Sequence, residues 1–262
     1  MTQFKQSLIL LSLATLFQTN HCALIIAKPA AVTALYTLMQ SHQALKLLST
    51  SSHGHQKNQD FLFLESLYID PYIEQTLKHW DITKDPLYLK NPARNEKLAN
   101  AYGKLIKSSY TCPIKYTAIS KEVGNGILAD TTIEPGHMIC ECTGILRVDS
   151  DIVKDSDWRE NKYLWNYPTV LSQQNPETKE YHNVHFCIDT SKAGNFSRFI
   201  NRSTTHHQNV VPCFISHNNL WHLVYFAIKT IKPGQQLLTS YGNNSWGSPH
   251  RRKYDVSSHI AQ

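Results

Sequence analysis

The sequence predicts an α+β protein that is helical up to about residue 110 and mostly β-sheet after it. Two patterns indicate this division. Between Val32 and Leu48 the apolar residues recur at about the 3.6-residue period of an amphipathic helix, with Pro29 near the expected start. After residue 110, short runs rich in β-branched and aromatic residues are separated by turns such as Glu134–Gly136 and Lys232–Gly234, in which proline presets one dihedral angle and glycine tolerates positive φ.

The elements follow in chain order from these patterns. A break rich in Ser, Thr, His and Gly at residues 49–55 ends the first helix. Further helices are expected over residues 60–69, 72–80 and 95–107. Strands are expected over residues 111–120, 127–131, 138–147, 182–188, 210–216 and 221–227. We therefore expect a helical N-terminal region at residues 1–110, a main domain at residues 111–246 and a tail at residues 247–262.

Composition and charge exclude several classes of protein. With 262 residues, of which 41% are hydrophobic and 18% charged, the chain is long enough for a buried core and is unlike collagen-like, low-complexity or coiled-coil sequences. The formal net charge of +6 is too small and too scattered to indicate nucleic-acid binding. No apolar run is long enough for a polytopic membrane protein, so we expect a soluble protein without an integral membrane span. We also expect a monomer.

The N-terminal residues 5–27 allow two interpretations. Lys5 followed by the apolar stretch Leu8–Phe17 has the charge and length of a signal-peptide core, which would imply export. However, Thr19–Cys22 offers no small-x-small cleavage site, and Ala23–Ala27 is apolar again. A buried helix accounts for the segment equally well.

The cysteines and histidines predict no metal site. The six cysteines form no CxxC pair and no dense framework, which disfavours structural zinc and disulfides. Cys140 and Cys142 share one face of an expected strand and are interpreted as buried free thiols. His206 and His207 are interpreted as a solvated pair, because adjacent side chains of an extended loop point apart and no carboxylate or thiol lies close in sequence.

A nucleophilic hydrolase is one alternative that these residue types leave open. Cys187 or Cys213 would serve as the nucleophile, with His185 or His222 as the base. No nucleophile motif accompanies them.

Short motifs follow one another through the second half of the chain, and each is weak by itself. Gly124–Gly126 could be a plain hairpin turn, and Tyr241-Gly242 could be a strand end. The series is Gly124–Ala129, Glu134–Gly136, Glu141–Gly144, Cys187–Asp189, Gly194–Ser203, Asn209–Pro212 and Leu238–Gly242. In order and spacing, over about residues 115–246, it resembles the SET-domain protein lysine methyltransferases.

The resemblance implies a fold of several small sheets in which the C-terminal strand threads under a loop, a pseudoknot that departs from the usual unknotted topology. The segment containing Asn201 would then pack against the segment ending at Tyr241. The implied reaction transfers a methyl group from S-adenosyl-L-methionine to the neutral ε-amine of a lysine in a protein substrate, with a histone tail as the family's usual substrate. Alignment of the reactants supplies the catalysis, and an apolar channel lowers the pKa of the lysine.

The resemblance also assigns roles to residues. Tyr241 would be the catalytic residue beside the transferring methyl group. The cofactor-binding residues would be Val123, Gly124, Asn125, Tyr163, Asn201, Arg202 and Trp246. The substrate channel would be lined by Tyr163, Trp165 and Thr239. Ordinary core packing stays an alternative for Trp165, as does a surface position for Trp246.

The sequence departs from the family pattern at several positions. Arg202 replaces the usual histidine, and the loop Thr204–Asn209 is two residues longer than the family spacing. A guanidinium close to a sulfonium is unfavourable unless it points to solvent or meets a carboxylate. Thr239 and Ser240 replace an aromatic residue and an aspartate, and no cysteine follows Cys213, so the family's C-terminal zinc cluster is absent. These departures motivate a second hypothesis, a SET-like binding module without catalytic activity, beside the leading hypothesis of a methyltransferase.

Overall fold

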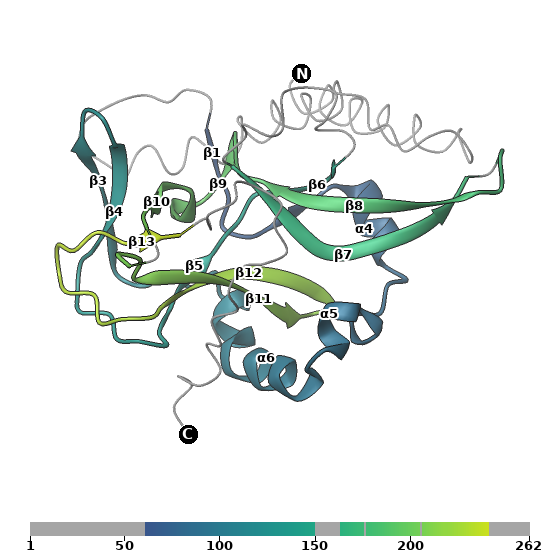
Figure 1. Ribbon diagram of the computed structural model, residues 1–262, viewed down its shortest axis with the longest axis horizontal. Coiled ribbons are helices and arrows are strands. Elements are labelled where there is room, and N and C mark those ends of the chain that lie inside the picture. Colours follow the sequence, from purple (N-terminus) through teal and green to yellow (C-terminus); the bar gives the residue numbers. More distant parts are fainter. Residues whose placement is uncertain (1–60, 150–162, 176, 205, 241–262) are drawn as a thin grey trace, which may run out of the picture.

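The computed structural model describes residues 61–149, 163–175, 177–204 and 206–240 (Figure 1). In this part of the chain the strands form five small sheets, which confirms the predicted mostly-β, α+β fold class. The strands are β1 (Leu62–Phe63), β2 (Tyr68–Ile69), β3 (Ile114–Ser120), β4 (Gly124–Ala129), β5 (Met138–Glu141), β6 (Ile145–Val148), β7 (Leu164–Gln174), β8 (Tyr181–Asp189), β9 (Ala193–Gly194), β10 (Asn201–Arg202), β11 (Val210–His217), β12 (Leu220–Ala227) and β13 (Leu238–Thr239). The helices are α4 (Pro71–Leu77), α5 (Pro86–Leu89), α6 (Pro92–Lys107) and the short 3-10 helices η1 (Ile82–Lys84) and η3 (Phe196–Phe199).

The central sheet has the strand order β11-β12-β5. Strands β11 and β12 pair antiparallel from Val210↔Ala227 to His217↔Leu220. Asn218 and Asn219 join them at φ values of 47° and 63°, the left-handed region that the tight turns of hairpins require and that asparagine tolerates. Trp221, Tyr225 and Phe226 of β12 are among the largest fully buried side chains, so this strand lies at the centre of the core.

Helix α6 covers one side of that sheet (Figure 1). The Asn91 side chain accepts a hydrogen bond from Arg94 N at 3.1 Å and Pro92 lies in the first turn, which are local signals for a helix start. Leu98, Tyr102 and Ile106 then recur every four residues and are buried against Met138, Ile215 and Phe226. The predicted helix over residues 95–107 is confirmed.

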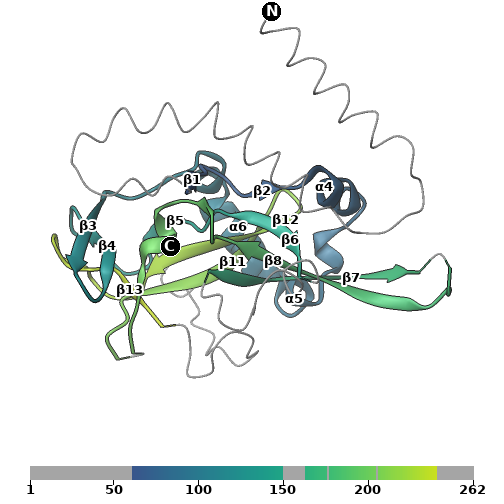
Figure 2. The same ribbon diagram turned by 90° about the horizontal axis from the view of Figure 1, so that it is seen from above.

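The second large sheet has the order β2-β6-β8-β7 and ends in a long hairpin. Figures 1 and 2 show the tip of the β7–β8 hairpin at one end of the molecule and the β3–β4 hairpin at the other. The predictions included β8 but missed β7, whose burial alternates from Tyr167 onward as expected for a strand with one covered face.

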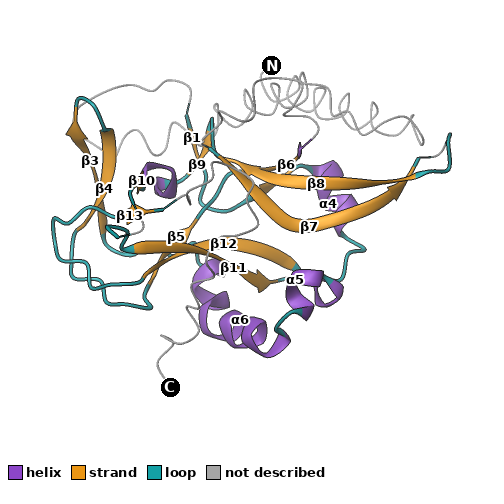
Figure 3. Ribbon diagram, in the orientation of Figure 1, coloured by secondary structure: helices purple, strands orange, loops and turns teal. Residues whose placement is uncertain are grey.

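Two predictions about local structure are wrong. Residues 61–69, the described part of this segment, are not a helix: β1 pairs parallel with β9, beside which it is labelled in Figure 3, and β2 pairs parallel with β6. These strands are two residues long and depend on partners far along the chain, so their own sequence carries little periodicity. The strand predicted over residues 138–147 is two strands, because the chain leaves one sheet after Glu141 and enters another at Ile145. The boundary at residue 110 stays a prediction.

Two predictions concern the ends of the chain. The signal segment or buried helix at residues 5–27 and the tail at residues 247–262 lie outside the described residues. Among the residues that the structure describes, no helix is long and apolar enough to cross a membrane.

Gly194, in β9, should tolerate no side chain. A Cβ atom there would lie 2.7 Å from the backbone oxygen of Thr143, which cannot move away as a flexible side chain could. We expect Gly194→Ala to lower the free energy of unfolding by about 1 to 3 kcal/mol, the usual cost of overpacking. Urea denaturation measures this change, with Val170→Ala at an exposed position of β7 as the control. Equal midpoints for the two variants would contradict the packing at Gly194.

Candidate active site

The asparagine motif and the C-terminal motif meet in a pair of short parallel strands. Asn201 pairs with Leu238 and Arg202 with Thr239, joining β10 to β13. Ser203 N extends the pairing by donating to Thr239 O at 2.8 Å. Figure 1 shows the two strands together beside the β3–β4 hairpin. The predicted contact between the Asn201 segment and the segment that leads to Tyr241 is thereby confirmed.

The glycine turn reaches the same place through Asn201. The Asn201 side-chain nitrogen donates to Asn125 O at 3.1 Å and so links β10 to the start of β4. Gly124 has a φ of 78°, and apart from its two chain neighbours no heavy atom of the described residues lies within 4 Å of the position where its Cβ would stand. A turn of this kind presents bare backbone to open space and lets a ligand approach closely. Val123, beside it, is 52% exposed.

Gly126 is required for the opposite reason. A Cβ at Gly126 would lie 2.7 Å from Ile119 Cγ1 and 2.8 Å from the side-chain nitrogens of both Asn201 and Gln236. The space beside this glycine is therefore already filled by side chains of β3, of β10 and of the segment before β13. Of the two glycines in the motif, Gly124 faces open space and Gly126 permits the strands to pack.

Asn209 fastens the last described strand, a role that the sequence analysis did not assign. Its backbone N donates to Leu238 O at 2.9 Å, its side-chain nitrogen donates to Gln236 O at 2.8 Å, and its side-chain oxygen accepts from Leu238 N at 2.8 Å. The residue is 3% exposed. Its position in the motif series was visible in the sequence, but its partners became known only from the fold.

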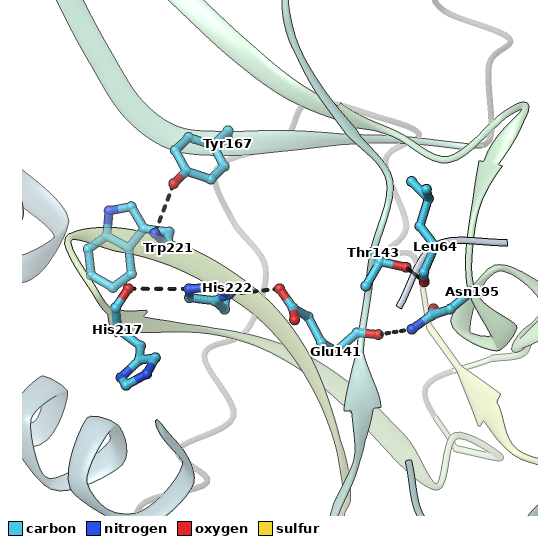
Figure 4. A network of polar contacts seen from close by, with 8 residues as sticks. All are labelled: Leu64, Glu141, Thr143, Tyr167, Asn195, His217, Trp221 and His222. Carbon is cyan, nitrogen blue, oxygen red and sulfur yellow. Dashed lines mark hydrogen bonds and ion pairs between the residues drawn. The ribbon is translucent and has the colours of Figure 1, made fainter. Parts of the chain in front are cut away.

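Asn195 holds the beginning of the asparagine loop in a similar way (Figure 4). Its side-chain oxygen accepts from Ser197 N at 3.1 Å and caps η3, while its side-chain nitrogen donates to Glu141 O at 2.7 Å. The cap thus connects η3 to the end of β5. The motif Gly194–Ser203 contains this residue, but the sequence alone indicates no role for it.

The predicted channel residues lie in different environments. Tyr163 is half-buried, and its carbonyl accepts from Thr190 N at 2.9 Å. Trp165 is 5% exposed and packs edge-to-face with Tyr225 in the main core, which is the alternative left open for it. Thr239 is fully buried, and among the described residues its hydroxyl has no hydrogen-bond partner.

Arg202 is exposed on β10. A guanidinium close to a sulfonium is tolerated when it points to solvent, because water screens the repulsion between the two charges. The exposed position of Arg202 agrees with this requirement. Tyr241 and Trp246, the predicted catalytic residue and the predicted closing aromatic, lie outside the described residues.

His222, one of the two histidines considered as the base of a hydrolase, belongs to a buried polar network (Figure 4). His222 Nδ1 lies 2.7 Å from Glu141 Oε1, and its Nε2 lies 3.2 Å from His217 O. Both ring nitrogens are engaged, so the imidazole serves the packing of β12 on β5. Burial, with smaller effects of His222 and Lys107, lowers the pKa of His217 below its usual value, while Glu141 opposes this shift.

The thiols are buried as predicted. Cys140 and Cys142 are each 1% exposed and free. Burial raises the pKa of Cys142 to about 12, so this thiol is protonated and unreactive at neutral pH. Cys187, a candidate nucleophile, is also 1% exposed. In the described part of the chain no group of three or more His, Cys, Asp or Glu side chains is placed to hold a metal ion.

Comparison with known proteins identifies the domain. The SET domain family matches residues 124–242. The histone-lysine N-methyltransferase Su(var)3-9 of Drosophila melanogaster is 31% identical over 140 residues, which cover 53% of this chain and 21% of that protein. Human histone-lysine N-methyltransferase EHMT1 is 33% identical over 134 residues, which cover 48% of this chain and 9% of that protein. The chain therefore matches only a small part of the length of these relatives.

Among solved structures, the polycomb repressive complex 2 of Chaetomium thermophilum is similar with a TM-score of 0.42 and 26% identity, over 60% of this chain and 20% of that one. The match to the SET domain family begins at the Gly124 turn and ends just after Tyr241. Residues 124–242 of this chain therefore match the SET domain, and the two relatives described above are histone-lysine N-methyltransferases.

Proposed function

We propose that the protein is an S-adenosyl-L-methionine-dependent protein lysine N-methyltransferase. The observation that carries the proposal is the junction of three motifs: the Gly124 turn, the Asn201 loop and the strand before Tyr241. Each motif has a simple structural explanation by itself. Their convergence on one place, from residues far apart in the sequence, favours a common site.

The residues at this junction fit the cofactor. The open space over Gly124 suits the close approach of a ligand to the backbone of Val123–Asn125. Asn201 and the backbone of Arg202 would meet the adenosine, and Tyr163 would line the same site. When bound, S-adenosyl-L-methionine supplies an electrophilic methyl group on a sulfonium, and the lysine nitrogen displaces S-adenosylhomocysteine as the new N–C bond forms.

The protein's own residues would align the substrate lysine with the methyl group and favour the deprotonated form of its amine. Tyr241 would orient the lysine amine through its hydroxyl, and such alignment can supply about 7 to 11 kcal/mol of a barrier in favourable cases. Channel walls of low polarity disfavour the ammonium form of the substrate lysine, so its pKa falls and its lone pair becomes available. The proton leaves to water before the attack. No side chain needs to act as a strong base.

Methyl transfer by the full chain tests the proposal. The protein is incubated with S-adenosyl-L-methionine labelled in the methyl group and with core histones, because the relatives are named histone-lysine N-methyltransferases. Label on a histone lysine, located by mass spectrometry and suppressed by excess S-adenosylhomocysteine, is the expected result. Calorimetric titration with the cofactor accompanies the assay.

The two measurements separate the alternatives. Cofactor binding without transfer to histones or to a mixture of cellular proteins would overturn the enzymatic proposal in favour of a binding module. Neither binding nor transfer would overturn the cofactor assignment as well. Transfer to a protein other than a histone would support the activity and replace the substrate.

A further inference from the structure

Arg198 lies among three aromatic rings next to the proposed cofactor site. Its guanidinium carbon is 4.2 Å from the ring centroid of Tyr163, 4.5 Å from that of Phe61 and 5.7 Å from that of Phe199. Its Nη1 donates to Ser191 O at 2.6 Å. These distances are within the range of cation–π contacts, and the hydrogen bond fixes the guanidinium in place.

The turn at residues 190–192 forms hydrogen bonds with the backbone next to two of the rings that contact Arg198. Thr190 donates to Tyr163 O from its backbone N at 2.9 Å and from its hydroxyl at 2.8 Å. Two residues later, Lys192 O accepts from Leu62 N at 2.8 Å, where β1 pairs with β9. The turn therefore fixes the backbone of Tyr163 and the backbone next to Phe61. The orientation of the Tyr163 ring depends on what packs against its face, and the Arg198 guanidinium packs there.

The position of Arg198 in the sequence connects this cluster to the site. It lies in η3, between the capping Asn195 and Asn201, which contacts the Gly124 turn. Phe199 packs edge-to-face on Tyr116 of β3 at 4.7 Å between centroids. The cluster thus lies between the asparagine loop and Tyr163, two parts of the proposed cofactor site.

We propose that Arg198, supported by Phe61, is a positioning residue that holds the Tyr163 ring in the orientation needed for cofactor binding. The inference rests on the proposed function. It also extends the site, because Phe61 lies outside the matched SET domain of residues 124–242. The segment before the domain would then complete the cofactor site through β1 and β9. A planar guanidinium suits this place because it stacks on rings and keeps a directed hydrogen bond, which a lysine ammonium does not do.

A double-mutant cycle between positions 198 and 163 tests the proposal with the full chain. We expect Arg198→Lys to weaken the binding of S-adenosyl-L-methionine, measured by calorimetry, about five- to tenfold. In a Tyr163→Leu background the same change should weaken binding less than twofold, because the ring that Arg198 orients is gone. Phe61→Leu should act in the same direction with a smaller effect. Arg94→Lys on α6, which contacts Cys213 instead, is the matched control and should change nothing.

The same double-mutant cycle is measured on the free energy of unfolding, a quantity that does not require the protein to bind a cofactor. Urea unfolding of the same four proteins measures whether the two side chains interact without any cofactor. Equal weakening of cofactor binding by Arg198→Lys in both backgrounds would overturn the proposal, because Arg198 would then act without Tyr163. If the wild type binds no cofactor, the proposed function fails, and additive unfolding energies would overturn the Arg198–Tyr163 contact separately.

Discussion

Tyr241→Phe should lower the rate constant of methyl transfer by about 10²-fold while changing the dissociation constant of S-adenosyl-L-methionine less than twofold. The variant keeps the aromatic ring and removes only the hydroxyl that would orient the lysine amine. A displacement of about 1 Å between reacting groups can lower a rate about 10²-fold. Single-turnover transfer of a labelled methyl group measures the rate. Calorimetry measures the affinity on the same preparations.

Tyr181→Phe is the matched control for this prediction. Tyr181 is 70% exposed and begins β8 at the tip of the hairpin, at the end of the molecule opposite the β3–β4 hairpin (Figures 1 and 2). The two variants remove the same atom from the same residue type. A loss of transfer shared by both, or an unchanged rate in Tyr241→Phe, would show that Tyr241 is not the catalytic residue.

Asn209→Ala should reduce methyl transfer by a comparable factor, through the strand that leads to Tyr241. The change removes two side-chain hydrogen bonds, to Gln236 O and from Leu238 N, each 2.8 Å long. Each buried group left unpaired costs about 1 to 3 kcal/mol, so β13 is released from its place. A displacement of about 1 Å at the reacting groups suffices for a 10²-fold loss of rate.

A second variant separates positioning from general loss of stability. Thr169→Val removes a buried hydrogen bond of similar kind, from Thr169 Oγ1 to Asp85 Oδ2 at 2.9 Å, in the sheet that carries β7 and away from β13. Both variants are assayed at a temperature where urea titration shows them to be folded. We expect Thr169→Val to keep the wild-type rate constant of transfer and Asn209→Ala to lose it. Equal losses would mean that Asn209 only stabilises the fold.

The short strands show where reasoning from the sequence reached its limit. The long hairpin of β11 and β12 carries a strong β pattern and was predicted nearly to its ends. By contrast, β1 and β2 have two residues each, and their pairing with β9 and β6 is what makes them strands. A helix was predicted there because apolar residues in a short window fit either period.

The candidate site divides in the same way. The order of the motifs indicated the family, and the predicted contact between the Asn201 segment and the C-terminal motif is present in the structure. The sequence could not place Trp165, which packs in the core, nor assign Asn209 and Asn195 their hydrogen-bond partners. These outcomes depend on the neighbours that a side chain meets after folding.

The amino-acid sequence alone determined the features that arise within a few residues. The cap and apolar period of α6 and the positive φ of Gly124 follow from local steric and hydrogen-bonding preferences. Only the tertiary structure decided that Phe61 meets Arg198 and that Asn209 holds Leu238. The physical reason is that burial and strand pairing are set by contacts between residues far apart in the chain, whose partners no local pattern specifies.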